Sequence, residues 1–190
     1  MNQLTFAVAA VVTDEAGRVL LCQQSQGHRR WGLPGGKIRP AESPVHAAIR
    51  DIREETSMET DILDLVGIYQ LTGDGQPPVR RPAGPGRPAP LPDVLVHVFR
   101  GRTRIGEAAV NAPGRICRLS WHDPDDLPEP MTPITRAAIA DAVAGRSGML
   151  RDVRRDAEPE LPEAVEPARI VGPSGSVENG AGQDRLVAAG

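Results

Sequence analysis

Three carboxylates in residues 51–55 are the first feature of the chain that could do chemistry. Asp51 and Glu55 are four positions apart, so on a helix they would share one face, with Glu54 within a turn of both. Such a cluster repels itself unless a hard divalent cation, usually Mg²⁺ beside phosphate, binds its oxygens. Arg50 lies close enough to orient a carboxylate. The alternative is a solvated helix face with exposed ion pairs.

A glycine pair precedes this cluster and adds a second chemical possibility. Gly35 and Gly36 have no Cβ, so their backbone could approach a phosphate or a metal closely. Pro34 would stiffen the entry to this loop, and Lys37 would supply a cation. We therefore take Gly35, Gly36 and Lys37 as candidate substrate-binding residues. An ordinary tight turn is an equally simple interpretation.

The carboxylates need a helix to bring them together, and the sequence predicts one over residues 44–56. Ser43 is a suitable N-cap, and Pro44 suits the first helical position, where its missing N–H does not matter. Apolar residues recur with helical spacing and are expected to pack on a sheet. They are Val45, Ala48, Ile49 and Ile52.

Strand-like patterns surround this helix. They cover residues 4–13, 18–24, 62–71, 94–100 and 116–121, and a turn at residues 14–17 makes the first two a hairpin. A last helix is predicted from Thr132 to Gly145, with Ile139, Ala142 and Val143 on its apolar side. The order β-β-α-β-β-β-α favours an α+β or sandwich fold over a doubly wound parallel sheet.

Composition divides the chain near residue 145. We expect one domain over residues 1–145, interrupted by a flexible Pro/Gly/Arg-rich loop at 72–92. Residues 146–190 lack aromatic residues and a helical apolar stripe, so we expect a disordered tail. A short helical extension near residues 149–155 stays open, as does a tail that docks a partner protein.

Charge and cysteine content restrict the partners and the compartment. The net charge of −3 gives no reason to expect nucleic-acid binding or membrane attachment. The apolar run at residues 6–12 is too short to span a bilayer, and no basic segment precedes it. Cys22 and Cys117 lie in strand-like stretches and are expected to be buried free thiols, although one disulfide stays open. We expect a cytoplasmic protein.

Together, the glycine loop and the acidic helix closely resemble the Nudix box. Gly36 is followed after five residues by Glu42, and after seven more by the segment RDIREETSM, residues 50–58. The family pattern is Gly-x5-Glu-x7-Arg-Glu-U-x-Glu-Glu-x-Gly-U, where U is aliphatic. Every spacing matches, and the segment WGLPG at residues 31–35 resembles the usual lead-in.

The resemblance implies a fold and a set of roles. The Nudix fold is an α/β/α sandwich around a mixed β-sheet, with the box as a loop–helix–loop. By position, Asp51, Glu54, Glu55 and the Gly36 carbonyl would hold Mg²⁺ or Mn²⁺, and Arg50 would orient the carboxylates. Arg50, Asp51, Glu54 and Glu55 are thus the catalytic candidates. Metal-activated water would attack phosphorus in a nucleoside-diphosphate-linked small molecule. The resemblance also leaves a homodimer open.

Two residues depart from the family pattern. Asp51 replaces a Glu and is one methylene shorter, and Ser57 replaces the glycine that ends the helix in a left-handed conformation, at a cost of about 1 kcal/mol. A shortened metal ligand leaves open a catalytically weak protein that binds or senses nucleotides. An active enzyme could clean up nucleoside triphosphates or cleave ADP-ribose or nucleotide sugars.

Other polar residues have weaker claims to a role. Glu107 could be the general base, although a solvated loop residue is the simpler interpretation. Arg80, Arg81 and Arg87 could reach a nucleotide but are by default part of a solvated loop. We expect Trp31 to pack beside the glycine loop rather than to stack on a base.

Overall fold

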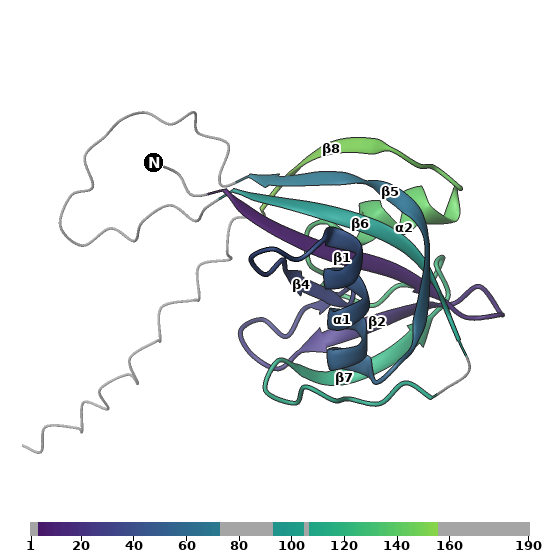
Figure 1. Cartoon of the computed structure of the whole chain (residues 1–190). Helices are drawn as coiled ribbons and strands as arrows, with labels where there is room; N and C mark the ends of the chain where they lie inside the picture. Colours follow the sequence, from purple (N-terminus) through teal and green to yellow (C-terminus); the bar gives the residue numbers. More distant parts are fainter. Residues whose placement is uncertain (1–3, 73–92, 105–106, 156–190) are drawn as a thin grey trace, which may run out of the picture. The chain divides into compact units, whose positions relative to one another are not determined.

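The computed structural model describes residues 4–72, 93–104 and 107–155. Within these ranges the chain forms one eight-stranded sheet and two α-helices (Figure 1). The elements are β1 (Thr5–Thr13), β2 (Val19–Gln24), β3 (Trp31–Gly32), β4 (Gly35–Lys37), α1 (Pro44–Thr56), β5 (Thr60–Thr72), β6 (Val94–Thr103), β7 (Ile116–His122), α2 (Thr135–Val143) and β8 (Met149–Arg154).

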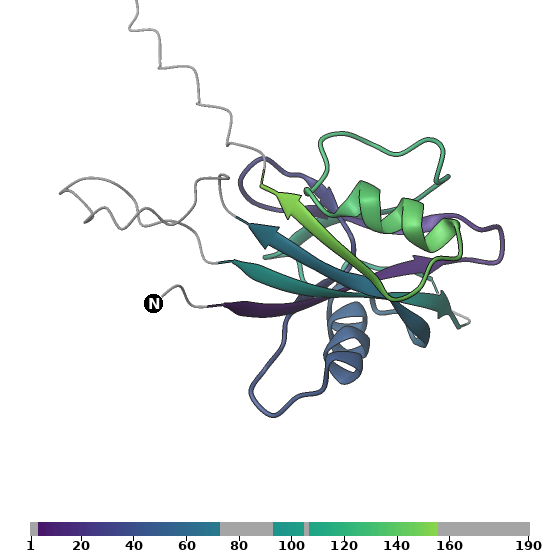
Figure 2. The ribbon, with the colours of Figure 1, turned by 90° about the horizontal axis from the view of Figure 1, so that it is seen from above.

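The sheet is mixed, and the two helices cover its opposite faces. Its main path runs β3-β2-β1-β6-β5-β8, with β4 paired to β1 and β7 paired to β2. The β1–β6 and β5–β8 pairs are parallel, and the other pairs are antiparallel. Figure 2 shows α1 and α2 on either side of the sheet. The predicted α/β/α sandwich around a mixed sheet is confirmed.

Strand β1 is buried on both faces because it lies between the two helical layers. Val8 and Val12 pack in the cluster that contains Ile52 of α1. Val11 points to the other face and joins the cluster that contains Ile139 of α2. Alternation along a strand explains this division, and burial on both sides explains the unbroken apolar run at residues 8–12.

Helix α1 has the predicted bounds. The Ser43 hydroxyl accepts a hydrogen bond from the His46 backbone N–H at 3.2 Å, and Pro44 opens the helix. Ser57 ends it in the left-handed region, with φ of 59°. One predicted packing residue is wrong, because Val45 is exposed. The buried face instead begins at Ala47 and Ala48, one turn further into the helix, where α1 meets the sheet.

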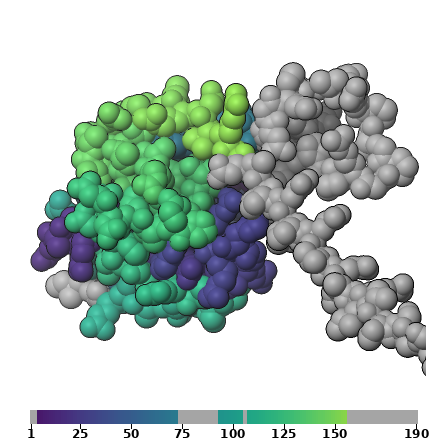
Figure 3. Space-filling model, turned by 180° about the vertical axis from the view of Figure 1, so that it is seen from behind, coloured from purple at the N-terminus to yellow at the C-terminus, as the bar shows by residue number. Residues whose placement is uncertain are grey.

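The end of the described chain differs from the sequence prediction. Residues 149–154 form strand β8, parallel to β5, so the helical extension proposed there is wrong and the fold continues past residue 145. Helix α2 begins at Thr135 rather than Thr132, because Thr132–Ile134 makes the turn that precedes it. Val143, predicted on its apolar side, is exposed. Figure 3 shows this face, with α2 and β8 in green and yellow-green.

A buried carboxylate ties β8 to the rest of the sheet. Asp141 of α2 accepts a hydrogen bond from the Tyr69 hydroxyl of β5 at 2.7 Å. It also accepts hydrogen bonds from Arg146 at 2.8 Å and from Arg151 of β8. These donors, the Arg151 guanidinium above all, hold the pKa of Asp141 well below its usual range.

The remaining predictions on composition have mixed outcomes. Both cysteines are free, as expected, but only Cys22 is buried, since Cys117 lies on an exposed position of β7. The described helices are all too short or too polar to cross a bilayer. Most of the predicted 72–92 loop and residues 156–190 of the predicted tail lie outside the described residues.

Candidate active site

The glycine pair is a short strand rather than a tight turn. Strand β4 pairs with β1, placing Gly35 opposite Ala9 and Gly36 opposite Val8. Gly35 has a φ of 153°, and a Cβ built on it would lie 2.2 Å from the Val8 carbonyl oxygen. Only glycine therefore allows this close pairing. The pairing holds the loop of the box against the sheet, beside α1.

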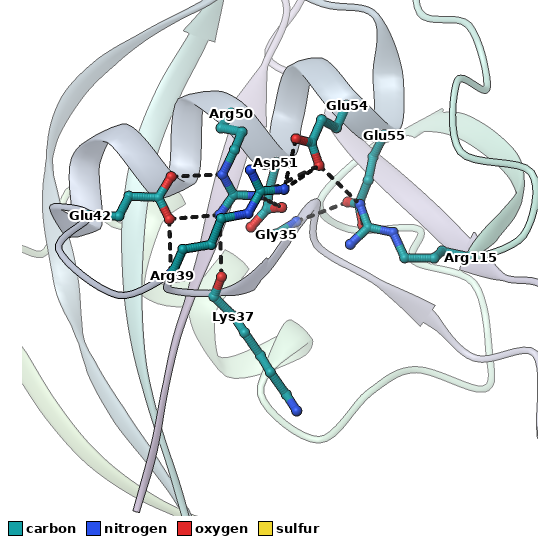
Figure 4. Close-up of polar contacts among 9 residues, drawn as sticks. All are labelled: Gly35, Lys37, Arg39, Glu42, Arg50, Asp51, Glu54, Glu55 and Arg115. Atoms are coloured by element: carbon teal, nitrogen blue, oxygen red, sulfur yellow. Dashed lines mark hydrogen bonds and ion pairs between the residues drawn. The ribbon is translucent and has the colours of Figure 1, made fainter.

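Arg50 binds the loop and the helix together (Figure 4). Its guanidinium donates two hydrogen bonds to Glu42, from Nε at 2.7 Å and from Nη2 at 2.8 Å. It also donates to the Asp51 Oδ1 atom at 2.6 Å and to the Lys37 carbonyl oxygen at 3.2 Å. The Arg50 guanidinium, helped by the Arg39 backbone N–H, lowers the pKa of Glu42 to about 2. The Arg50 side chain is only 18% exposed. The predicted orienting role is consistent with this geometry.

Asp51 has one buried oxygen that no hydrogen bond satisfies. Its side chain is 1% exposed, and Oδ2 lacks a hydrogen-bond partner within the described part of the chain. A Cβ built on Gly36 would lie 2.9 Å from this same atom. Burial raises the pKa of Asp51, although Arg50 opposes that effect. Buried polar atoms normally have a partner, and a bound cation would give this oxygen one.

Glu55 is also buried, and β4 holds one of its oxygens. The Gly35 backbone N–H donates to Oε2 at 3.0 Å, while Oε1 lies 3.4 Å from the Arg115 guanidinium. Burial raises the pKa of Glu55 to about 7, against the lowering effects of the Gly35 N–H and Arg115. The carboxyl group of Glu55 therefore gains or loses its proton near neutral pH when no cation is bound.

Glu54 is the exposed member of the cluster, and arginines surround it. Arg39 donates to Oε1 at 3.0 Å and to Oε2 at 3.4 Å. Arg50 and Arg115 approach Oε2 at 3.6 and 3.9 Å. Arg39 and Arg115 were not among the residues predicted from the sequence. Only Arg39 carried a signal, its place two residues after the Gly-Gly-Lys run.

The donor set fits a hard divalent cation, although the side chains are not gathered around one point. In the residues that the structure describes, no three Asp, Glu, His or Cys side chains form a ready metal-binding group. Glu54 instead forms an ion pair with Arg39, and Glu55 forms one with Arg115. Asp51 Oδ2 nevertheless faces the Gly36 backbone without a partner, and oxygen ligands are those that Mg²⁺ prefers.

A pocket of about 240 Å³ opens beside the cluster. Glu55 and Gly35 line it together with Cys22, Gln24, Arg115 and Thr132. Arg115 also lines a wider hollow of about 450 Å³ with Gln24 and Gly27. The acidic cluster therefore adjoins space for a small molecule, with a guanidinium at its border.

Several other candidates are not brought to the carboxylates. The Lys37 side chain is exposed and points away from the cluster (Figure 4). Glu107 is exposed. Trp31 is buried, as expected, with Arg118 over its ring at 5.8 Å. Arg80, Arg81 and Arg87 lie outside the described residues.

Comparison with known proteins supports the same family. A family model described as NUDIX domain matches residues 3–142. A "MutT-like protein" of Streptomyces ambofaciens is 26% identical over 145 residues, covering 76% of this chain and 80% of the relative. A Bacillus subtilis protein named "Putative 8-oxo-dGTP diphosphatase" is 29% identical, with 69% and 74% covered.

A solved structure agrees with these matches. The MutT NUDIX hydrolase from Burkholderia pseudomallei is 28% identical, with a TM-score of 0.58, and the match covers 73% of this chain and 98% of that one. The sequence spacing, the sandwich fold and these similarities give one answer. The chain belongs to the Nudix family of hydrolases.

Proposed function

We propose that this chain is a Mg²⁺-dependent pyrophosphohydrolase that cleaves the diphosphate bond of a nucleoside-diphosphate-linked small molecule. The observation that carries the proposal is the buried Asp51 Oδ2 atom, which lies unsatisfied against Gly36 and adjoins Glu55 along one helix face. Mn²⁺ is expected to substitute for Mg²⁺, because both accept carboxylate and carbonyl oxygens.

The residues of the box divide the work. Asp51, Glu54, Glu55 and the Gly36 carbonyl would hold the cation. A bound divalent ion there would neutralise the diphosphate and lower the pKa of the attacking water. Arg50 keeps Asp51 in place through a 2.6 Å hydrogen bond, while the Gly35 N–H fixes Glu55. A carboxylate of the cluster would accept the proton of the attacking water.

Nucleoside triphosphates are the first substrate class to test. The Bacillus subtilis relative carries an 8-oxo-dGTP diphosphatase name, and an Escherichia coli relative, 33% identical over 72 residues, is named CTP pyrophosphohydrolase. The chain spans 53% of the latter. ADP-ribose and nucleotide sugars form the second class. We place the protein in the cytoplasm, acting on small molecules rather than on nucleic acid.

A second candidate is a Nudix protein that binds nucleotides and turns them over slowly. The arginines on Glu54 and Glu55, together with the shorter Asp51, favour it. Asp51→Glu separates the two functions. Because Asp51 already reaches Gly36 and Arg50, we expect less than a tenfold gain in kcat, whereas a large gain would favour the binding protein.

The direct test is a substrate panel with Mg²⁺. It contains nucleoside triphosphates, ADP-ribose, dinucleoside polyphosphates and nucleotide sugars, and turnover is measured as released phosphate or nucleotide. Glu55→Gln is expected to abolish turnover of the active member. Glu59→Gln is the matched control, because the Glu59 side chain pairs with Arg53 rather than with the acidic cluster. Absence of turnover across the panel would refute the enzymatic proposal.

A further inference from the structure

Arg39 and Arg115 reach the acidic cluster from two different loops, Arg39 from a variable position of the box and Arg115 from outside it. Arg39 lies between β4 and α1, and Arg115 lies just before β7. Both guanidiniums contact Glu54, and Arg115 also contacts Glu55 (Figure 4). They therefore occupy the same carboxylate oxygens that the proposed function gives to a cation.

These two arginines are held far less firmly than Arg50. Their side chains are 59% and 50% exposed, and such exposed ion pairs contribute little to stability. Arg50, by contrast, makes two hydrogen bonds to Glu42 and is enclosed by the loop. Arg50 is thus a fixed part of the site, whereas Arg39 and Arg115 can change partners at small cost.

A guanidinium that leaves Glu54 remains beside the site. Arg115 borders both pockets, one of which Glu55 also lines, and its planar fork matches two oxygens of a phosphate. We propose that Arg39 and Arg115 rest on Glu54 and Glu55 in the free protein and transfer to the substrate's phosphate oxygens when a divalent cation takes the carboxylates. This inference rests on the proposed function.

The exchange has a signature that a purely structural role would not give. In the free protein the arginines compete with the cation, so removing one should tighten metal binding. In the complex they bind phosphate, so removing one should weaken phosphate binding. The two constants must move in opposite directions.

The test measures both constants on the full chain. Mn²⁺ binding to the free protein is followed by the loss of its free-ion paramagnetic resonance signal. Binding of inorganic pyrophosphate with saturating Mn²⁺ is followed by calorimetry. The variants are Arg39→Ala and Arg115→Ala. Arg53→Ala is the control, because Arg53 lies on α1, as Glu54 and Glu55 do, but pairs with Glu59.

For both variants we expect roughly three- to tenfold tighter Mn²⁺ binding and about tenfold weaker pyrophosphate binding, with no change in Arg53→Ala. Mn²⁺ binding that is equal or weaker in the variants, or absent throughout, would overturn the exchange. So would unchanged pyrophosphate binding. Neither readout requires turnover, so the result is independent of whether any substrate in the panel is hydrolysed.

Discussion

The Gly35 backbone N–H donates a 3.0 Å hydrogen bond to the Glu55 carboxylate, although the two residues are 20 positions apart. This bond joins the short strand β4 to the last turn of α1, and so joins the two halves of the box. The close pairing with β1 requires glycine here, because a side chain on Gly35 would collide with the β1 backbone. Loop and helix are therefore positioned as one unit.

Between about pH 8 and pH 5, the metal-free protein should become more stable as the pH falls. The folded-state pKa of Glu55 is raised from 4.5 to about 7, so the folded protein binds more protons than the unfolded chain between these values. The buried Glu55 charge destabilises the fold fully above about pH 7, and this destabilisation disappears below about pH 4.5. At about 1.4 kcal/mol per pH unit it amounts to roughly 3 kcal/mol.

Urea unfolding at pH 5 and pH 8, with chelator, checks this pH prediction. The wild-type difference should exceed that of Glu55→Gln, because the variant cannot ionise. An equal pH dependence in both proteins would contradict it.

The Gly36→Ala variant should fold but should have much lower activity. Its Cβ would approach Asp51 Oδ2 at 2.9 Å and displace the carboxylate, for which we expect roughly a hundredfold loss in kcat/KM. Alanine at Gly35 should instead cost about 3 kcal/mol of stability, because it meets β1 backbone. Thermal unfolding together with kinetics distinguishes the two variants. A fully active Gly36→Ala would be inconsistent with the site.

Glycine at position 57 should stabilise the protein. Ser57 adopts a left-handed conformation that glycine reaches without strain, and its N–H still bonds to the Arg53 carbonyl. After the greater entropy that glycine has in the unfolded chain, the net gain should be about 0.5 kcal/mol. Denaturant midpoints of wild type and Ser57→Gly measure it. A lower midpoint in the variant would contradict the strain assigned to this residue.

Shortening the chain to residue 145 should be much more harmful than shortening it to residue 155. The shorter form loses β8 and leaves buried Asp141 without Arg146 and Arg151. An uncompensated buried charge costs about 3–5 kcal/mol. Thermal unfolding of the two truncated chains tests this, and equal midpoints would count against a structural role for β8.

Local signals explain why α1 could be predicted to the residue. Ser43 and Pro44 mark its start through their own side-chain and backbone chemistry, and the family pattern places Ser57 at its end. The spacing of the box then placed Asp51 and Glu55 on one face. Their deep burial did not follow from the sequence, because charged residues are normally exposed.

Contacts between distant segments could not be predicted in the same way. The segment MLRDVR at residues 149–154 does not alternate between apolar and polar residues, so its sequence does not indicate a strand. Pairing with β5 decides the outcome. Arg115 reaches Glu55 only because β7 pairs with β2 and brings its loop to the helix. No feature near position 115 of the sequence indicates this contact.

Hydrolysis in ¹⁸O-labelled water tests the central claim most directly. The most active substrate of the panel is incubated with the wild-type protein and Mg²⁺, with the wild-type protein and chelator, and with the Glu55→Gln variant and Mg²⁺. The masses of the products are measured by mass spectrometry. We predict one ¹⁸O atom on a product phosphate, turnover only with Mg²⁺, and none in the variant. Turnover that persists in chelator, or products without the label on phosphorus, would contradict metal-dependent attack of water on the diphosphate.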